Sequence, residues 1–358
     1  MTDRYQKLAK IMIEWSLALK KEEKILINAY GLESLTLAKA IYKVSLKMGA
    51  YPYIDYKVDD LSYFFYNNAS DKQLNRKPEI DLFLAKWADK IVSLVAENNA
   101  FELASANPKK IMTRTKAVEQ VKNIVLQKSW VLTYLPTASM AQNARLSLDE
   151  CRQLYFDSTV QDYAKMSQNI KKVKKLLDRI EEIHIVGEKT DLKLYFKGRR
   201  FQVCDGQYNI PDGEIFSAPL ETRTKGRIYF DFPSLRQGKL VKDAYFEFDK
   251  GRVLSFDASE NKPFLKASLE IDSGAKRLGE FAFGLNYSLT NFMYNTLFDE
   301  KLGGTVHLAL GSAYPPDEDG GGLNKSAIHW DFVKDMRKAG SKIYGDGKLI
   351  FKEGKILF

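Results

Sequence analysis

The chain has 358 residues, more than a single hydrophobic core usually accommodates, so we expect two domains. Its 45% hydrophobic and 28% charged residues are typical of a globular protein and exclude an extended disordered chain. The formal charge of +9 raises the question of nucleic-acid binding. Because the basic residues are mostly mixed with acidic ones and accompany no nucleic-acid motif, we expect a solvated surface and no nucleic-acid partner.

The cysteines and the apolar runs indicate a cellular location. Cys151 and Cys204 lie far apart and have neither a zinc-finger spacing nor the pattern of a disulfide framework. The first twenty residues are charged throughout, unlike a secretory signal, and no run approaches the roughly 18 apolar residues of a membrane span. We therefore expect a cytoplasmic protein without a membrane partner.

The amino-terminal half alternates helical patterns with short apolar strands. This alternation is typical of βαβ units and predicts an α/β domain with a mainly parallel sheet over residues 1–165. No G-x-G-x-x-G follows any of the strands, so we see no dinucleotide-binding fingerprint. The predicted helices are Tyr5–Ala18, Leu35–Met48, Pro78–Ala88 and Ile111–Val125, and the predicted strands are Lys24–Tyr30, Tyr51–Tyr56, Lys90–Asn98 and Ser129–Pro136.

The pattern changes in the second half of the chain. The chain leads through Leu148–Tyr155 into a long charged run over Tyr163–Glu182, which is helical by spacing. Beyond them, polar and apolar residues alternate between Gly and Pro turns as far as about Ala282, which is typical of antiparallel hairpins. We therefore predict a second domain over residues 166–358, of α+β class and largely antiparallel β.

Histidines are concentrated near the carboxyl end. His307 and His329 are two of the chain's three histidines, and His329 precedes Asp331 by two residues. In extended backbone, residues two apart share a face, so His329 and Asp331 would point to the same side. A histidine from a neighbouring strand would complete a pocket suited to zinc, cobalt, manganese or ferrous iron. An ordinary His–Asp pair without a metal is the alternative at this stage.

Two glutamates of the β-rich half extend this set of donors. Glu214 follows the turn-forming residues Pro211 to Gly213, which would hold it at the start of a strand. Glu280 follows Gly279 in an otherwise apolar strand, where a carboxylate is costly to bury without a partner. Each glutamate considered alone favours a structural role. Together with the histidines and Asp331, they would supply ligands for two metals about 3.5 to 4 Å apart.

Four ordered segments now carry a resemblance to a known family. They read NIPDGEIFSAP (209–219), RLGE (277–280), LFDEKLGGTVHLALGSAY (297–314) and NKSAIHWD (324–331). In this order they resemble the signature segments of the metallo-aminopeptidases represented by aminopeptidase T and aminopeptidase S, a thermophilic type of metalloprotease. The resemblance implies a two-metal exopeptidase site in the carboxyl-terminal domain, an α/β amino-terminal domain, and a homodimer.

Carried over residue by residue, the resemblance implies a set of site residues. Glu280 would manage the proton of the attacking water as well as bind metal, and Tyr314 would hydrogen-bond the oxyanion. The cofactors would be two divalent ions, zinc, cobalt, manganese or magnesium, and the substrates would be peptides with a free N-terminus. The implied metal ligands are Glu214, Glu280, Glu300, His307, His329 and Asp331.

Two other classes of function remain open from the sequence. Ring-cleaving dioxygenases with a single iron resemble this family and use a His, His, Asp set, which His307, His329 and Asp331 would furnish. A non-catalytic binding protein that keeps the fold is the other alternative. The presence of Glu214, Glu280 and Tyr314 favours the peptidase.

Overall fold

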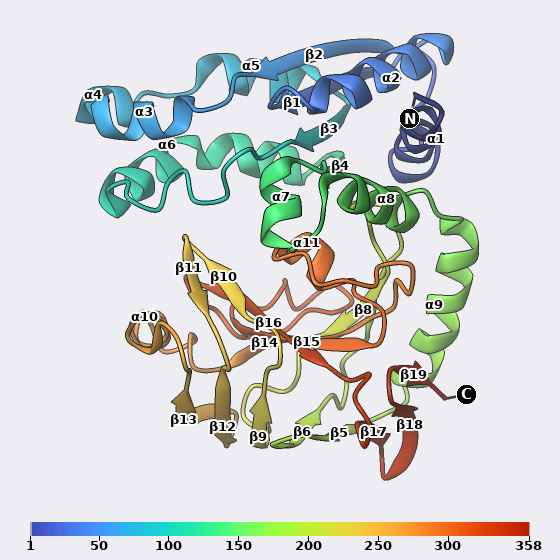
Figure 1. The fold of residues 1–358 in the computed structure, drawn as a ribbon, viewed down its shortest axis with the longest axis vertical. Helices are drawn as coiled ribbons and strands as arrows, with labels where there is room; N and C mark the ends of the chain where they lie inside the picture. The colour runs from blue at the N-terminus through green and yellow to red at the C-terminus, as the bar shows by residue number, and fades with distance from the viewer. Residues whose placement is uncertain (1, 358) are drawn as a thin grey trace. The chain divides into compact units, whose positions relative to one another are not determined.

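The computed structural model describes residues 2–357, which fold as two compact units (Figure 1). The first unit runs to Gln161 and also contains the segment Gly206–Pro211. The second unit contains Asp162–Asp205 and the chain from Asp212 onward. None of the helices formed by the described residues is long and apolar enough to cross a membrane.

The segment Gly206–Pro211 joins the first unit through β-type contacts that no local pattern predicts. Leu132 donates a backbone hydrogen bond to Tyr208 O at 2.8 Å and accepts one from Ile210 N at 2.9 Å. The rings of Trp130 and Tyr208 also pack with their centroids 5.1 Å apart. A strand and a segment more than 70 residues later therefore share one packing unit.

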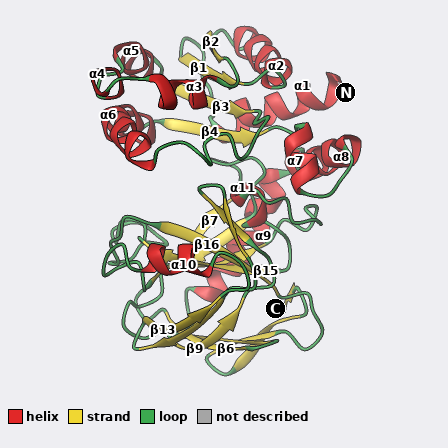
Figure 2. Cartoon of the chain, turned by 60° about the vertical axis from the view of Figure 1, so that its left-hand side comes forward, coloured by secondary structure: helices red, strands yellow, loops and turns green. Residues whose placement is uncertain are grey.

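The first unit contains a parallel sheet with helices on both faces. The strand order is β2-β1-β3-β4, with neighbouring strands parallel. The helices α1 and α2 lie on one side of the sheet, and α5 and α6 lie on the other (Figure 2). The strands are β1 (Lys24–Tyr30), β2 (Tyr51–Lys57), β3 (Lys90–Val95) and β4 (Ser129–Tyr134). Each of these strands begins at the residue that the sequence predicts.

The helices of the first unit include short ones that the sequence analysis missed. The predicted amino-terminal helix forms, but its second half is a π-helix, in which Leu17 N donates to Met12 O at 3.1 Å across five residues. The short helices α3, α4 and α7 were not predicted, because they have too few turns to show a periodic pattern. The helices are α1 (Thr2–Lys10), η1 (Ile11–Ser16), α2 (Ser34–Lys47), α3 (Leu61–Asn68), α4 (Asp71–Leu74), α5 (Glu79–Trp87), α6 (Pro108–Leu126), α7 (Ala138–Asn143) and α8 (Leu148–Thr159).

The second unit begins with α9 (Tyr163–Leu177), which is shorter than the sequence predicted. The expected continuation to Glu182 is wrong, because Glu182 already starts strand β5 (Glu182–Gly187). The cause is a distant carboxylate: Asp346 Oδ1 accepts hydrogen bonds from Glu182 N at 2.8 Å and from Glu181 N at 3.2 Å. Local helix propensity cannot report a contact with a residue more than 160 positions away.

Two antiparallel sheets form the rest of the second unit. The longer one has the order β13-β12-β9-β6-β5-β17-β18-β19, and the other has the order β16-β15-β14-β8-β7. Their apolar faces enclose one core that includes Phe281, Leu308 and Phe332 from the second sheet. The elements are β6 (Thr190–Tyr195), β7 (Gln202–Cys204), β8 (Glu214–Ser217), β9 (Lys225–Tyr229), β10 (Ser234–Arg236), β11 (Lys239–Val241), β12 (Tyr245–Asp249), β13 (Arg252–Asp257), α10 (Lys262–Leu269), β14 (Leu278–Gly284), α11 (Thr296–Asp299), β15 (Thr305–Gly311), β16 (His329–Asp335), β17 (Lys342–Gly345), β18 (Lys348–Lys352) and β19 (Lys355–Ile356). The predicted fold class, an α/β part with a parallel sheet followed by a largely antiparallel α+β part, is confirmed.

Candidate metal centre

The candidate site lies on one face of the sheet β16-β15-β14-β8, opposite the face that packs into the core. On β15, Val306, Leu308 and Leu310 belong to the core, so His307 points to the other side. The strand register places Ala282 opposite His307, Ala309 opposite Asp331, and Gly284 opposite Glu214. Small residues on this face therefore alternate with the polar ones and leave room between them.

A β-bulge at Gly279 turns Glu280 toward this face. The register of β14 and β15 shifts between Leu278, which pairs with Leu310, and Glu280, which pairs with Ala309. Two residues of a regular strand that lie two positions apart share a face, but the bulge places Leu278 in the core and Glu280 on the site. A Cβ atom on Gly279 would lie 2.3 Å from Ser312 O, so the bulge requires glycine.

His307 is fully buried between two glutamates. Its Nε2 atom lies 3.1 Å from Glu280 Oε1 and 3.5 Å from Glu214 Oε2. Burial alone would lower the pKa of the imidazole, but the hydrogen bond to Glu280 and the charge of Glu214 outweigh it and raise the pKa to about 9. Glu214 is the first residue of β8, as the preceding turn predicts. The three side chains supply donor atoms within 4.8 Å of one another.

His329 and Asp331 point to the same side of β16, as the H-x-D spacing predicts. His329 Nε2 lies 3.5 Å from Asp331 Oδ1 and 3.6 Å from Glu280 Oε2. The other ring nitrogen, Nδ1, is 2.8 Å from Ser312 O, and a hydrogen bond donated there leaves Nε2 free to accept or to bind a metal. Burial opposes ionisation of Asp331, but the neighbouring His329 overcomes it and keeps the pKa of the carboxyl low.

Glu300 stands at the carboxyl end of α11 and joins the same cluster. Its carboxylate, His307 and Asp331 offer donor atoms within 4.8 Å of one another. Burial raises the pKa of Glu300 to about 8, although the charge of Lys301 opposes the shift. The preceding residue, Asp299, accepts backbone hydrogen bonds from Met293 N at 2.6 Å and Asn295 N at 2.8 Å. These bonds fix the segment that carries Glu300.

Lys301 is a member of the cluster that the sequence analysis missed. Its ammonium is 2.7 Å from Glu214 Oε1 and 2.8 Å from Glu300 Oε2, and the side chain is only 1% exposed. Burial would lower its pKa, but the charges of Glu214 and Glu300 raise it well above the usual value, so the lysine is a buried cation. The signal in the sequence was a lysine within the apolar stretch LFDEKLGG, directly after Glu300.

Tyr314 borders the cluster from the segment after β15. Its ring centroid is 6.0 Å from that of His329 and 5.0 Å from that of Phe216. The side chain as a whole is 46% exposed, but desolvation around its hydroxyl and the nearby charge of Glu280 raise the pKa of the phenol above its ordinary value, so the hydroxyl keeps its proton at neutral pH. A protonated phenol beside the histidine is a hydrogen-bond donor toward the cluster.

The donor set fits divalent metal ions. Among the described residues, no hydrogen-bond partner is present for the buried atoms Glu214 Oε2, His307 Nδ1 and Asp331 Oδ1. Buried carboxylate oxygens without a donor are costly, and a bound cation would compensate them. Carboxylates and imidazoles without a thiolate suit zinc, cobalt, manganese or magnesium, and several of these ions bind such sets.

Cys204 and Asp212 also lie beside Glu214, with donor atoms within 4.8 Å of one another. Neither was a predicted ligand. Burial raises the pKa of the Cys204 thiol well above its ordinary value, and the charge of Glu214 adds to the shift. Without a metal the thiol therefore keeps its proton at neutral pH. The proposed ligand set consists of the carboxylates and histidines that the sequence predicts.

These features are those of a protein with a candidate metal centre, built from carboxylates and imidazoles on a sheet face. Residues 1–356 match the family described as thermophilic metalloprotease (M29), and the chain belongs to this family. Family membership implies a divalent metal cofactor.

Curated relatives and a solved structure agree with this assignment. The chain is 25% identical to aminopeptidase 2 of Geobacillus stearothermophilus, over 99% of this chain and 97% of that protein. It is also 25% identical to aminopeptidase AmpS of Bacillus subtilis, over 98% of this chain and 97% of the relative. Wild-type AmpT from Thermus thermophilus shares the fold, with a TM-score of 0.85 over 99% of both chains at 21% identity. The resemblance inferred from the sequence is confirmed, and the chain is a metallo-aminopeptidase.

Proposed function

We propose that the protein removes N-terminal residues from peptides at a centre that holds two divalent metal ions. The observation that supports this proposal is the convergence of carboxylates and imidazoles on the outer face of β8, β14, β15 and β16, with buried carboxylate oxygens left without donors. The proposed metal ligands are Glu214, Glu280, Glu300, His307, His329 and Asp331, and the proposed catalytic residues are Glu280 and Tyr314.

Two subsets of this centre motivate the proposal of two ions. Glu214, Glu280 and His307 form one group of donors within 4.8 Å of one another, and Glu300, His307 and Asp331 form a second. His307 belongs to both groups, so the two sets of donors lie side by side. When bound, the ions supply Lewis-acid polarisation of the scissile carbonyl and make the attacking water more acidic.

Glu280 is placed to handle the proton of the reaction. The bulge at Gly279 brings its carboxylate to the middle of the cluster, 3.1 Å from His307 and 3.6 Å from His329. It accepts a proton from the attacking water and delivers that proton to the leaving amine. Burial of the glutamate, which is 4% exposed, keeps bulk water away from the transferred proton.

Tyr314 and the remaining carboxylates complete the mechanism. The Tyr314 hydroxyl donates a hydrogen bond to the oxygen on which negative charge develops, and such a donor contributes about 100- to 1000-fold in rate. Glu214, Glu300 and Asp331 would help to hold the ions, and a second ion held there would bind the free α-amino group of the substrate. This would account for removal of the terminal residue rather than cleavage inside a chain.

The proposal also covers the oligomeric state, the location, the metal ions and the domain bounds of the enzyme. The resemblance to aminopeptidases T and S supports a homodimer, and the composition of the sequence supports a cytoplasmic location. Zinc, cobalt, manganese and magnesium all suit the donor set. The catalytic domain is proposed to span residues 166–358, after an α/β domain over residues 1–165.

The proposed function is tested with metal-stripped protein and a small panel of dipeptides and aminoacyl amides. Zinc, cobalt, manganese, magnesium and iron are added back separately, and each substrate is also offered with its amino group acetylated. We expect a divalent ion to restore hydrolysis, and acetylation to abolish it. Absence of cleavage with every ion, together with one tightly bound iron per chain, would instead favour the ring-cleaving dioxygenase; no bound metal would favour a binding protein.

A further inference from the structure

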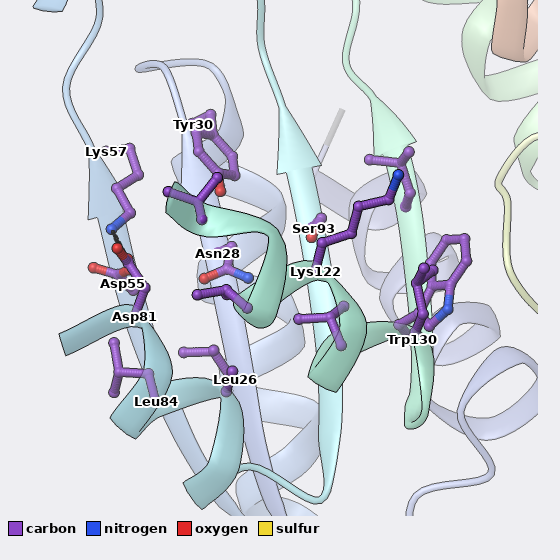
Figure 3. A pocket seen from close by; sticks show the side chains of 16 residues that line it. Leu26, Asn28, Tyr30, Asp55, Lys57, Asp81, Leu84, Ser93, Lys122 and Trp130 are labelled. Carbon is purple, nitrogen blue, oxygen red and sulfur yellow. Dashed lines mark hydrogen bonds and ion pairs between the residues drawn. The ribbon is translucent and has the colours of Figure 1, made fainter. Parts of the chain in front are cut away.

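A cavity of about 460 Å³ lies in the first unit, on the face of the parallel sheet that α5 and α6 cover (Figure 3). Its volume is within the usual range of small-molecule sites, roughly 300 to 1,000 Å³. It is lined by side chains of β1 to β4 together with α5 and α6. All of these elements are separate from the strands that carry the candidate metal centre.

The floor of the cavity is polar at a place where a parallel sheet is normally apolar. Asn28 of β1 is the cross-strand neighbour of Asp55 on β2 and of Ser93 on β3. Strands in the middle of a parallel sheet are covered on both faces and are usually lined by Val, Ile and Leu. A row of an aspartate, an asparagine and a serine across this face therefore has a stability cost, which a bound polar ligand would offset.

The two neutral members of this row have unused hydrogen-bonding capacity. Among residues 2–357, no hydrogen-bond partner is present for the side chains of Asn28 and Ser93, although both are partly buried. The amide of asparagine can both donate and accept, and the hydroxyl of serine can do the same. Together they can hold the polar end of a small molecule.

Charges of opposite sign lie on the two sides of this floor (Figure 3). On the side of β2, Lys57 is paired with Asp55 at 2.8 Å and with Asp81 at 3.2 Å, so two carboxylates share one ammonium and leave a net negative charge. On the side of β4, Lys122 extends from α6 without an ion-pair partner among the described residues. The floor therefore separates a site for a cation from a site for an anion.

One end of the cavity is apolar. Leu26 and Leu84 line it below the polar row in Figure 3, and Trp130 lines it on the side of β4. The helix above, α6, has none of its residues 108–126 fully buried, although it faces the sheet with Val118, Val121 and Val125. Val125 packs against Leu26 and Leu84, whereas Val118 and Val121 line the cavity and offer apolar surface to a ligand.

We propose that this cavity binds an apolar amino acid with free amino and carboxylate groups. The ammonium lies toward Asp55 and Asp81, the carboxylate lies toward Lys122 and the Asn28–Ser93 pair, and the side chain lies against Leu26, Leu84 and Trp130. Such an amino acid belongs to the same class as a product of the proposed reaction. The binding itself requires neither metal nor turnover.

Titration calorimetry of the full-length, metal-stripped protein with leucine tests this site. Two probes that each lack one charge, 4-methylpentanoate and 3-methylbutylamine, are titrated under the same conditions. We expect leucine to bind and each analogue to bind about tenfold more weakly, because each loses a hydrogen bond to a charged group. No binding of leucine up to 10 mM, or equal binding of all three probes, would overturn the proposal.

Variants locate the binding. Lys122→Gln changes an exposed side chain and is expected to weaken leucine binding about tenfold, and Asn28→Leu, which fills the floor, is expected to abolish it. Lys116→Gln is the matched control, since Lys116 is exposed on the same helix but does not line the cavity. Binding that persists in Lys122→Gln and Asn28→Leu but disappears in His307→Ala would place leucine at the metal centre and refute the proposed site. Hydrolysis assays with metal test the aminopeptidase proposal separately.

Discussion

The parallel sheet of the first unit and the sheet β16-β15-β14-β8-β7 of the second both carry buried or partly buried polar side chains on one face. The contents of the two faces differ. The second unit gathers charged residues, and Lys301 lies 2.7 Å from Glu214 there. The first unit has a neutral pair, Asn28 and Ser93, without hydrogen-bond partners among the described residues. The parallel sheet departs from the rule that both faces of such a sheet are apolar, and the antiparallel sheet is unusual in that its polar face is buried.

The two polar faces are stabilised in different ways. Charged groups at the metal centre hold one another through ion pairs, and metal ions would complete the compensation. Neutral groups at the cavity have no such mutual attraction, so they depend on solvent or on a ligand. Removing a charge should therefore have a large effect on stability or activity at the candidate metal centre. Removing a neutral polar group should have a small effect at the cavity of the first unit.

The largest effect is expected for Glu280→Gln. This change keeps the shape of the side chain but removes the group that accepts the proton, so we expect kcat to fall by about 100- to 10,000-fold. Metal analysis of the variant should still find bound metal, because five other proposed ligands remain. Glu270→Gln, at an exposed carboxylate at the end of α10, serves as the control and should keep full activity. Full activity of Glu280→Gln would remove Glu280 from the mechanism.

Lys301→Met is expected to lower stability by about 3 to 5 kcal/mol in metal-stripped protein, because it leaves Glu214 and Glu300 buried without their cation. Metal ions should reduce this loss, since their charge replaces that of the ammonium. Urea unfolding with and without metal measures both effects. Lys193→Met is the matched control. It removes only the surface ion pair with Glu182, so the free energy of unfolding should change by less than about 1 kcal/mol. Equal losses in the two variants would contradict the role of Lys301.

Gly279→Ala tests whether the bulge places the catalytic glutamate. The added Cβ would lie 2.3 Å from Ser312 O, so the backbone must shift, and we expect a loss of about 2 kcal/mol in stability together with reduced kcat. Gly187→Ala is the matched control, because its Cβ would meet neighbours at 3.5 Å and beyond. Thermal unfolding and turnover are measured for both. A variant at Gly279 with unchanged turnover would show that the bulge does not position Glu280.

Much of the fold and of the candidate site could be predicted from the sequence, for physical reasons that differ between residues. The strands of the first unit are short apolar runs between polar residues, so β1 to β4 begin where predicted. The grouping of His329 with Asp331 follows from strand alternation alone. Lys301 was missed because its role depends on Glu214, 87 positions away. The predicted end of α9 was wrong because Asp346 accepts a hydrogen bond from Glu182 N, the first residue of the next strand.

The cavity of the first unit could not be predicted from the sequence either, although the strands that form it could. Asn28 and Ser93 lie in segments that the sequence correctly predicts as strands, and nothing in either segment marks a pocket. The pocket exists because the strand register brings the two residues together and because α6 does not fill the space above them. Such a feature depends on pairing between strands more than 60 residues apart.

The smallest effect is expected for Asn28→Leu on the enzyme without added amino acid. A leucine removes an unpartnered amide and fills part of the cavity, so we expect stability to rise by about 1 kcal/mol and kcat to remain unchanged. Urea unfolding and turnover are measured beside Ser45→Ala, where the hydroxyl already donates to Ile41 O at 2.9 Å within α2 and its loss should destabilise slightly. A clear destabilisation by Asn28→Leu would mean that the amide has partners in solution, and the comparison between a self-compensated charged face and an uncompensated neutral face would then fail.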